Sequence, residues 1–202
     1  IDLIGVATDM GALRTVVEAY RSSFDQRLQE KFNAKALTLW PFGPQVLFCQ
    51  PDIAKLSDLS GNKVRVYDQS LANFVSSVGG TPVPLGFSEV QQSLARGVID
   101  CAITGPSSAN TAGWPEETSN MLPIAFQIAV QGYGINLDTW NKFSPEDQEK
   151  LQAAFDGLVS EIWAYSEEIF EDAVNCNVGE EPCETVKSYD LKLIPVSEED
   201  KA

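Results

Sequence analysis

Residues 63–104 read KVRVYDQSLANFVSSVGGTPVPLGFSEVQQSLARGVIDCAIT, and this stretch decides the class of fold. Short apolar runs alternate with segments in which apolar residues recur every three or four positions. In order, they predict a strand at 63–67, a helix at 69–78, a strand at 81–84, a helix from 88 to about 97 and a strand at 98–104. The last run is apolar almost throughout, which is typical of a strand buried in a parallel sheet. The β-α-β-α-β order therefore indicates an α/β lobe whose helices cover a mostly parallel sheet.

The flanking sequence adds further elements on both sides of this lobe. Apolar residues spaced along 15–31 predict a helix with one buried face. Strands are predicted at 36–40 and 46–49, with a proline turn at 41–44 between them. Beyond the lobe, apolar runs at 128–137 and 189–196 predict two more strands.

The longest feature is a helix that we expect to run from Pro145 to about Asn175. Ser144 is a suitable N-cap, Pro145 suits the first helical position, and acidic residues occupy the first turn. From Leu151 onward, apolar residues recur at spacings of three and four. At 1.5 Å per residue the helix would be about 45 Å long, so we expect it to brace two lobes.

The composition excludes several classes of protein. The 202 residues include 14 Lys+Arg, 29 Asp+Glu and no His, which gives a formal charge of −15. Such a surface repels nucleic acid and anionic lipid, and the lack of His removes the common catalytic triads and most transition-metal sites. The sequence holds no phosphate-binding loop, dinucleotide fingerprint or nucleophile elbow. We therefore expect no catalytic residues, no metal and no cofactor.

The four cysteines fall into two kinds of environment. Cys176 and Cys183 flank a polar, turn-like segment, so in an oxidising compartment we predict that they form a disulfide. The alternative is two unrelated surface thiols after a helix. Cys49 and Cys101 lie in apolar strands and are expected to be buried free thiols.

Polar residues at strand ends are the candidates for a binding site, because ligands of open α/β sheets bind outside the carboxyl ends of the strands. Arg65 lies within the apolar strand 63–67, Gln45 lies between the proline turn and an apolar run, and Thr104–Ser108 follow a buried strand. The planar fork of an arginine suits a carboxylate. The alternatives are an internal salt bridge from Arg65 to Asp68, a structural amide at Gln45 and an ordinary turn at 104–108.

Several of these runs are familiar in order and spacing. They are DLSGNKVRV at 58–66, GGTPVP at 79–84, FSEV at 87–90, GVID at 97–100, NLDTW at 136–140 and SPEDQ at 144–148. Together they resemble the DctP-like periplasmic solute-binding proteins of tripartite ATP-independent periplasmic (TRAP) transporters. The resemblance implies a type II periplasmic-binding-protein-like α/β fold, with two α/β lobes of mixed sheets, hinge strands and a long lobe-spanning helix.

The resemblance also implies a division of the chain. Residues 1–40 would be part of the N-terminal lobe, 41–128 the C-terminal α/β lobe, 129–185 a hinge strand with the spanning helix, and 186–202 a return strand to the C-terminal lobe. The chain begins at Ile1 without a leader, so we expect that a signal peptide has been removed. It resembles a fragment that lacks the N-terminal part and the C-terminal helices of the family.

The resemblance implies roles for individual residues. Arg65 matches the family arginine that pairs with a ligand carboxylate, Phe87 matches an aromatic residue that packs on the ligand, and Asp68 matches a polar pocket position. Gln45 stands where a second arginine is common, and Thr104-Gly105-Pro106 replace a motif with an asparagine. With Ser107 these residues make up the expected ligand site, and the departures disfavour a dicarboxylate such as succinate.

The function implied is capture of a small organic acid in the periplasm and its delivery to the membrane subunits of a TRAP permease. The expected partners are therefore that acid and those subunits. No nucleic acid is expected, nor any membrane span in the chain itself. Two alternatives stay open, namely an enzyme and the sensory domain of a receptor, each on a similar two-lobed scaffold.

Overall fold

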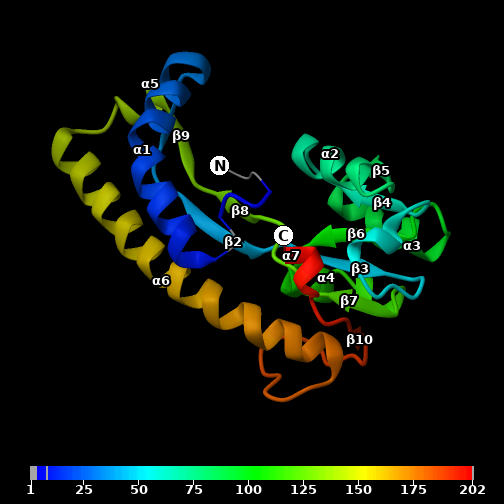
Figure 1. Ribbon diagram of the computed structural model, residues 1–202. Coiled ribbons are helices and arrows are strands. Elements are labelled where there is room, and N and C mark those ends of the chain that lie inside the picture. Colours follow the sequence, from blue (N-terminus) through cyan, green and yellow to red (C-terminus); the bar gives the residue numbers. More distant parts are fainter. Residues whose placement is uncertain (1–3, 8, 202) are drawn as a thin grey trace.

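The computed structural model describes residues 4–7 and 9–201, and within them the chain forms one six-stranded mixed sheet and two separate two-stranded ones. The six-stranded sheet has the order β10-β7-β3-β6-β4-β5 (Figure 1). Its strands are β3 Val46–Cys49, β4 Lys63–Val66, β5 Thr81–Pro84, β6 Cys101–Thr104, β7 Asn120–Leu122 and β10 Lys192–Leu193.

The parallel part of this sheet confirms the predicted β-α-β-α-β unit. β4 lies between β5 and β6 and is parallel to both, with Arg65 opposite Val83 on one side and Ala102 on the other. The connecting helices are α2 Gln69–Ser77 and α3 Val90–Ala95. Every residue of β3 and β6 is buried, because helices cover the sheet on both faces. This sheet and its helices are called the sheet lobe below.

Two helix starts in the sheet lobe are set by acidic side chains. The Asp68 carboxylate accepts a hydrogen bond from the Leu71 amide at 2.8 Å and so caps α2. The predicted start of the next helix at Ser88 is wrong. A 3₁₀ turn occupies 87–89, where the Glu89 carboxylate accepts from the Gly86 amide at 3.0 Å, and α3 begins only at Val90.

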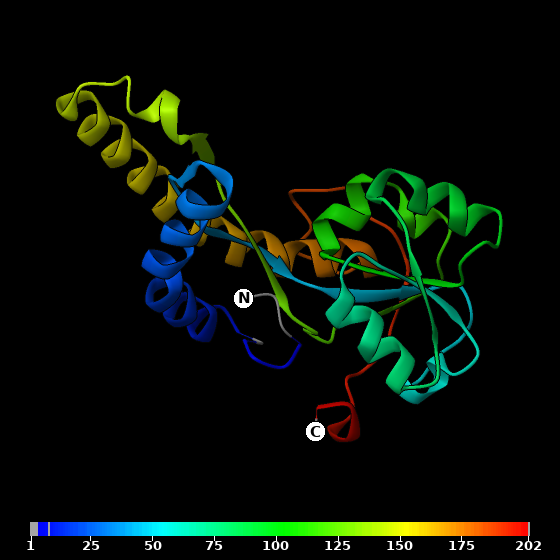
Figure 2. The same ribbon diagram turned by 90° about the horizontal axis from the view of Figure 1, so that it is seen from above.

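A long arm projects from the sheet lobe (Figures 1 and 2). It is built from α1 Met10–Phe32, β1 Ala34–Ala36, β2 Trp40–Pro44, β8 Ile128–Gln131, β9 Gly134–Asn136, α5 Leu137–Trp140 and most of α6 Pro145–Val178. β2 pairs antiparallel with β8, and β1 pairs antiparallel with β9. The expected turn at 41–44 is therefore wrong, because these residues belong to β2.

The predicted strand at 128–137 is divided into β8 and β9 at the point where residues 132–133 cross residues 37–38. There the Tyr133 carbonyl accepts from the amides of Leu37 and Thr38 at 2.8 and 3.3 Å, and the Tyr133 amide donates to Thr38 Oγ1 at 2.9 Å. Gly132 passes so close to Thr38 that a Cβ atom would collide with the Thr38 carbonyl oxygen. Only a glycine therefore fits at this crossing.

The predicted long helix is confirmed as α6, which has 34 residues and is about 51 Å long. The Ser144 side chain accepts from the Asp147 amide at 3.2 Å at its start, and Gly179 ends it with φ of 72°. α6 packs against β2 in the arm and against α4 Pro106–Thr111 in the sheet lobe. It thus spans both parts, as Figure 1 shows. At the end of the chain, residues 189–196 form only the short strand β10, and α7 Glu198–Lys201 follows.

The structure contains two disulfides among its described residues. Cys176–Cys183 closes the loop after α6, as predicted. The expectation of free thiols at Cys49 and Cys101 is wrong, because these two residues are bonded to each other. β3 and β6 are antiparallel neighbours, and their register places Cys49 directly opposite Cys101 with the Cα atoms 4.1 Å apart.

Candidate ligand-binding site

A cavity of about 500 Å³ opens between one edge of the sheet lobe and the β2–β8 ribbon. Its lining combines aromatic residues, one arginine and neutral hydrogen-bonding residues: Phe42, Gln45, Arg65, Tyr67, Phe87, Thr104, Ser108, Thr111 and Ala129. This cavity is called the Arg65 cavity below. Arg65 and Thr104 lie near the carboxyl ends of the parallel strands β4 and β6, and Phe87 follows β5. Because these ends meet at the same edge of a sheet, the cavity has the position expected of a ligand site.

Arg65 is the central charged group of this cavity. It is only 3% exposed. Its Nε donates to the Leu85 carbonyl oxygen at 3.1 Å and its Nη1 to the Ile103 carbonyl oxygen at 2.9 Å. The guanidinium carbon lies 5.4 Å from the centre of the Tyr67 ring and 5.7 Å from that of Trp114. The backbone and two rings therefore fix the plane of the guanidinium.

Arg65 carries its charge without an ion-pair partner in the part of the chain that the structure describes. Among the ion pairs of the described residues, none includes Arg65, and Nη2 has no hydrogen-bond partner there. Burial lowers the pKa of the Arg65 guanidinium from its ordinary value, which the nearby Tyr67 phenol opposes. An arginine nevertheless stays protonated in proteins. A buried cation of this kind is costly unless an anion joins it.

Asp68, the alternative partner of Arg65, is engaged elsewhere. Besides capping α2, its carboxylate accepts from Gln127 Nε2 at 2.8 Å. The same Nε2 donates to the Tyr67 hydroxyl at 2.8 Å. The buried Gln127 amide therefore ties Tyr67 to Asp68 and holds this wall of the Arg65 cavity in place.

The neutral polar groups come from the residue before β3, from the end of β6 and from α4. Gln45 is 2% exposed, and its Nε2 donates to the Gly43 carbonyl oxygen at 2.9 Å. Thr104 is 4% exposed at the end of β6. Ser108 and Thr111 follow on α4, where a spacing of three places them on one face of the helix.

Sequence reasoning brought together part of this set. Arg65, Gln45, Phe87 and Thr104 line one cavity, as expected. Asp68, Gly105 and Ser107 do not line it, and Asp68 has the structural role just described. Gly105 instead lies next to Gln45, where a Cβ atom would be 3.6 Å from Nε2.

Ser108, in the candidate segment 104–108, also lines the cavity. Four lining residues were missed, and the sequence held a signal for two of them. Tyr67 follows Arg65 by two positions, which places both on one face of an extended chain. Thr111 follows Ser108 at helical spacing after Pro106, an N1 proline. Phe42 was assigned to a turn, and Ala129 carries no chemical signal.

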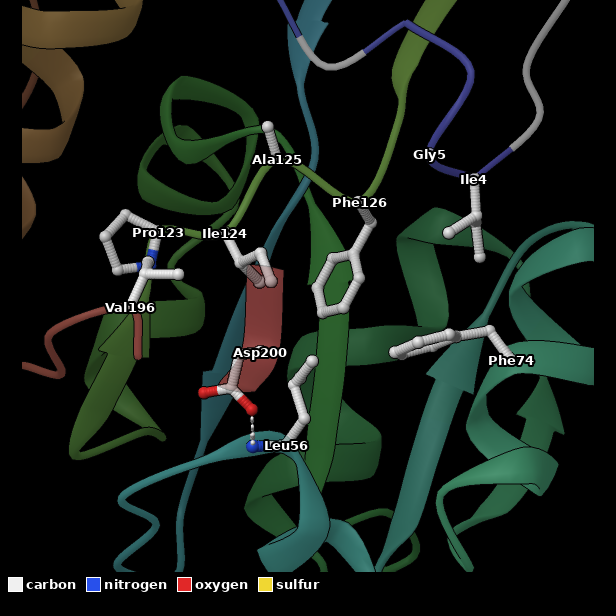
Figure 3. A pocket seen from close by; sticks show the side chains of 10 residues that line it. All are labelled: Ile4, Gly5, Leu56, Phe74, Pro123, Ile124, Ala125, Phe126, Val196 and Asp200. Atoms are coloured by element: carbon white, nitrogen blue, oxygen red, sulfur yellow. Dashed lines mark hydrogen bonds between the residues drawn. The ribbon is translucent and has the colours of Figure 1, made fainter. Parts of the chain in front are cut away.

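A larger cavity, of about 600 Å³, lies elsewhere on the sheet lobe and is a weaker candidate (Figure 3). Its walls are mostly apolar and include Leu56, Phe74 and Phe126. The ionisable side chain among its described lining is Asp200, whose Oδ1 accepts from the Leu56 amide at 3.0 Å, as the dashed line shows. Among the described lining residues of this cavity, an acid would find no cation to bind.

Two negative findings apply to the described residues alone. Within 4–7 and 9–201, no group of three or more His, Cys, Asp or Glu residues is arranged to hold a metal ion. In the same part of the chain, every helix is too short or too polar to cross a membrane.

Comparison by sequence identifies relatives of one kind. The chain is 28% identical over 152 residues to the sialic acid-binding periplasmic protein SiaP of Vibrio cholerae. The aligned region covers 74% of this chain and 47% of that protein. The chain is 27% identical over 150 residues to the ectoine-binding periplasmic protein TeaA of Halomonas elongata, which covers 72% of this chain and 44% of that protein. The chain thus spans about half the length of the relatives that it matches.

Comparison by structure identifies the fold. An extracytoplasmic solute receptor of Bordetella pertussis that binds pyroglutamic acid superposes with a TM-score of 0.87 at 22% identity, over 98% of this chain and 63% of that one. A TRAP periplasmic solute-binding protein of Desulfovibrio salexigens, with bound orotic acid, also superposes with a TM-score of 0.87 at 16% identity. The superposition covers 99% of this chain and 62% of that one. The predicted type II periplasmic-binding-protein-like fold is confirmed.

A family profile matches most of the chain. It is described as "Bacterial extracellular solute-binding protein, family 7" (DctP), and it matches residues 10–182. The two disulfides accord with the oxidising compartment in which such proteins are found. The resemblance noted in the sequence is therefore confirmed, and the chain belongs to family 7 of the bacterial extracellular solute-binding proteins, the DctP family.

Proposed function

We propose that the protein to which this chain belongs captures a small organic acid in the periplasm and delivers it to a TRAP-type membrane permease. It would act by binding and release, without catalysing a reaction. The enzyme and the receptor sensory domain, the two alternatives from the sequence, have no specific observation in their favour.

The observation that carries the proposal is the state of Arg65. This cation is buried at the edge of the sheet, lines the cavity, is held by backbone carbonyls and rings, and has no ion-pair partner among the described residues. A carboxylate bound in the Arg65 cavity supplies the missing negative charge and accepts charge-assisted hydrogen bonds.

The ligands named for related proteins support the same class of ligand. The similar proteins described above are named for sialic acid and pyroglutamic acid or hold orotic acid, and another TRAP solute-binding protein of the same fold holds L-malate. Each of these compounds carries a carboxyl group.

The shape of the chain supports delivery by lobe closure. Residues 41–128, the C-terminal lobe, would move as one body against residues 1–40. Residues 129–185 would be the hinge strand and the spanning helix, and residues 186–202 the return strand to the C-terminal lobe. The Arg65 cavity lies beside the β2–β8 ribbon, where a change of lobe angle would open or close it. The permease would bind the closed form.

The test is isothermal titration of the purified chain with a panel of organic acids. Removing one partner of a buried charged pair costs about 2–5 kcal/mol, so Arg65→Ala should weaken binding at least ~30-fold. Arg65→Lys keeps the charge but loses the fork, and should also bind more weakly than the unmodified chain.

The matched control is Arg96→Ala, which removes one positive charge from an exposed position at the end of α3. It should leave the affinity unchanged. Equal affinities for Arg65→Ala and the unmodified chain would refute the proposed role of Arg65, and product formation from any acid of the panel would favour an enzyme.

A further inference from the structure

We propose that the Arg65 cavity selects acids that carry a single carboxylate on a flat, unsaturated ring. This inference rests on the proposed function and names the class of ligand more narrowly.

The first argument is the number of cations. Among the described residues that line the Arg65 cavity, Arg65 is the one charged side chain. Gln45, Thr104, Ser108 and Thr111 offer hydrogen bonds but no positive charge. A second carboxylate would therefore leave water without gaining a counterion, which selects against dicarboxylates.

The second argument is the rigidity of that one cation. Two of the guanidinium nitrogens are held by the carbonyls of Leu85 and Ile103, and the Tyr67 and Trp114 rings lie near the group. The guanidinium is thus unable to swing toward a second or displaced carboxylate. The cation therefore stays at one fixed place in the lining, so the rest of the ligand must fit the walls around it.

The third argument is the chemistry of the walls. Phe42, Tyr67 and Phe87 all line the Arg65 cavity, and their exposed fractions are 46%, 37% and 43%. Exposed rings that converge on one cavity are unusual, since large apolar side chains are ordinarily buried. Together with the single cation, they match an anion whose remaining surface is apolar.

Phe87 shows which shape the walls favour. Its ring lies 5.4 Å from the Trp114 ring, with 36° between the two planes. Trp114 is fully buried and also contacts Phe48 edge-on, so it forms a fixed base under Phe87. Aromatic side chains gain more from an aromatic partner than from an alkyl chain of equal area. A flat ring in the ligand therefore fits Phe87 better than a flexible chain.

The test compares three probes by isothermal titration of the purified chain: benzoate, heptanoate and isophthalate. Benzoate and heptanoate each have seven carbon atoms and one carboxylate, and isophthalate adds a second carboxylate to the same ring. We expect benzoate to bind about tenfold more tightly than heptanoate because of the ring contacts. We expect the affinity for benzoate to exceed the affinity for isophthalate by about tenfold or more, because the second carboxylate of isophthalate would have no cation to pair with.

The matched variants are Phe87→Leu and Phe143→Leu. Both residues are exposed phenylalanines, 43% and 39%, and Phe143 contacts Trp140 just before α6, away from the cavity. Phe87→Leu should reduce the preference of benzoate over heptanoate to less than about threefold, and Phe143→Leu should leave it unchanged. Thermal melting of both variants establishes that each is folded.

The outcomes separate the inference from the proposed function. If the three acids bind with equal affinity and Arg65→Ala abolishes the binding of all of them, the inference is overturned and the proposed function stands. A preference for benzoate that survives Phe87→Leu would also overturn it. No Arg65-dependent binding of any of the three acids would count against both.

Discussion

Removal of the Cys49–Cys101 disulfide should destabilise the chain more than removal of Cys176–Cys183. The first disulfide joins β3 to β6 at the centre of the six-stranded sheet and links residues 52 positions apart. The second closes the loop after α6 and links residues 7 positions apart. A cross-link restrains the unfolded chain in proportion to the logarithm of the loop that it closes.

The loop lengths set the two magnitudes. In the chain-entropy model, a 52-residue loop corresponds to about 4 kcal/mol of stability at 25 °C, and a 7-residue loop to about 2.4 kcal/mol. Replacement of Cys49 and Cys101 by alanine also leaves space in a fully buried part of the sheet, so the double variant should lose more than the cross-link alone provides.

Guanidinium unfolding curves measure the difference. The oxidised chain should be compared with Cys49→Ala/Cys101→Ala and with Cys176→Ala/Cys183→Ala, each extrapolated linearly to water. The fully reduced chain isolates the cross-links from the packing change, since its side-chain volumes are nearly unaltered. A loss at the first pair no larger than the loss at the second would refute the reasoning, and so would two reactive thiols at Cys49 and Cys101 in the denatured, unreduced chain.

Two further predictions concern α6. Gly157→Ala should raise the free energy of unfolding by about 1 kcal/mol, because a Cβ atom there meets no neighbour and alanine favours a helix; chemical denaturation that shows no gain would contradict this. Asp172 accepts hydrogen bonds from the Thr185 side chain and the amides of Glu184 and Thr185, and these hold its pKa below the ordinary value of 3.8. Its stabilisation should therefore be complete above pH 3.8 and be lost as the pH falls through the lowered pKa. Asp172→Asn should lower stability at pH 7 and flatten the acid limb of a stability–pH curve, whereas an unchanged acid limb would refute this role.

Local pattern was enough for much of the fold. The strands and helices of 63–104 follow from apolar spacing over windows shorter than a dozen residues, and α6 follows from Ser144, Pro145 and the repeat after Leu151. These signals depend on near neighbours along the chain. The first and last residues of a strand do not follow from near neighbours alone. The extent of β10, for example, depends on its pairing with β7, about 70 positions away.

A residue of the candidate site could be predicted from the sequence where a charged side chain interrupts a run of apolar residues. An arginine inside an apolar strand is such an interruption, so Arg65 stood out, and the structure shows it buried in a cavity. Asp68 shows the limit of reasoning by resemblance. It precedes a helix, and its capping of α2 was a signal available in the sequence. Phe42 was lost because two nearby prolines indicate a turn, although an edge strand tolerates them.

The amino-acid sequence by itself determined the α/β class, the long helix and the family, and it singled out Arg65 as a candidate, because each depends on residues close together in the chain. Only the tertiary structure decided that β3 inserts antiparallel between β6 and β7 and so brings Cys49 opposite Cys101. It also decided that Gly132 crosses Thr38 and divides the predicted strand. Strand order and crossing points depend on which distant surfaces bury one another, and a local pattern of apolar residues is compatible with many such arrangements.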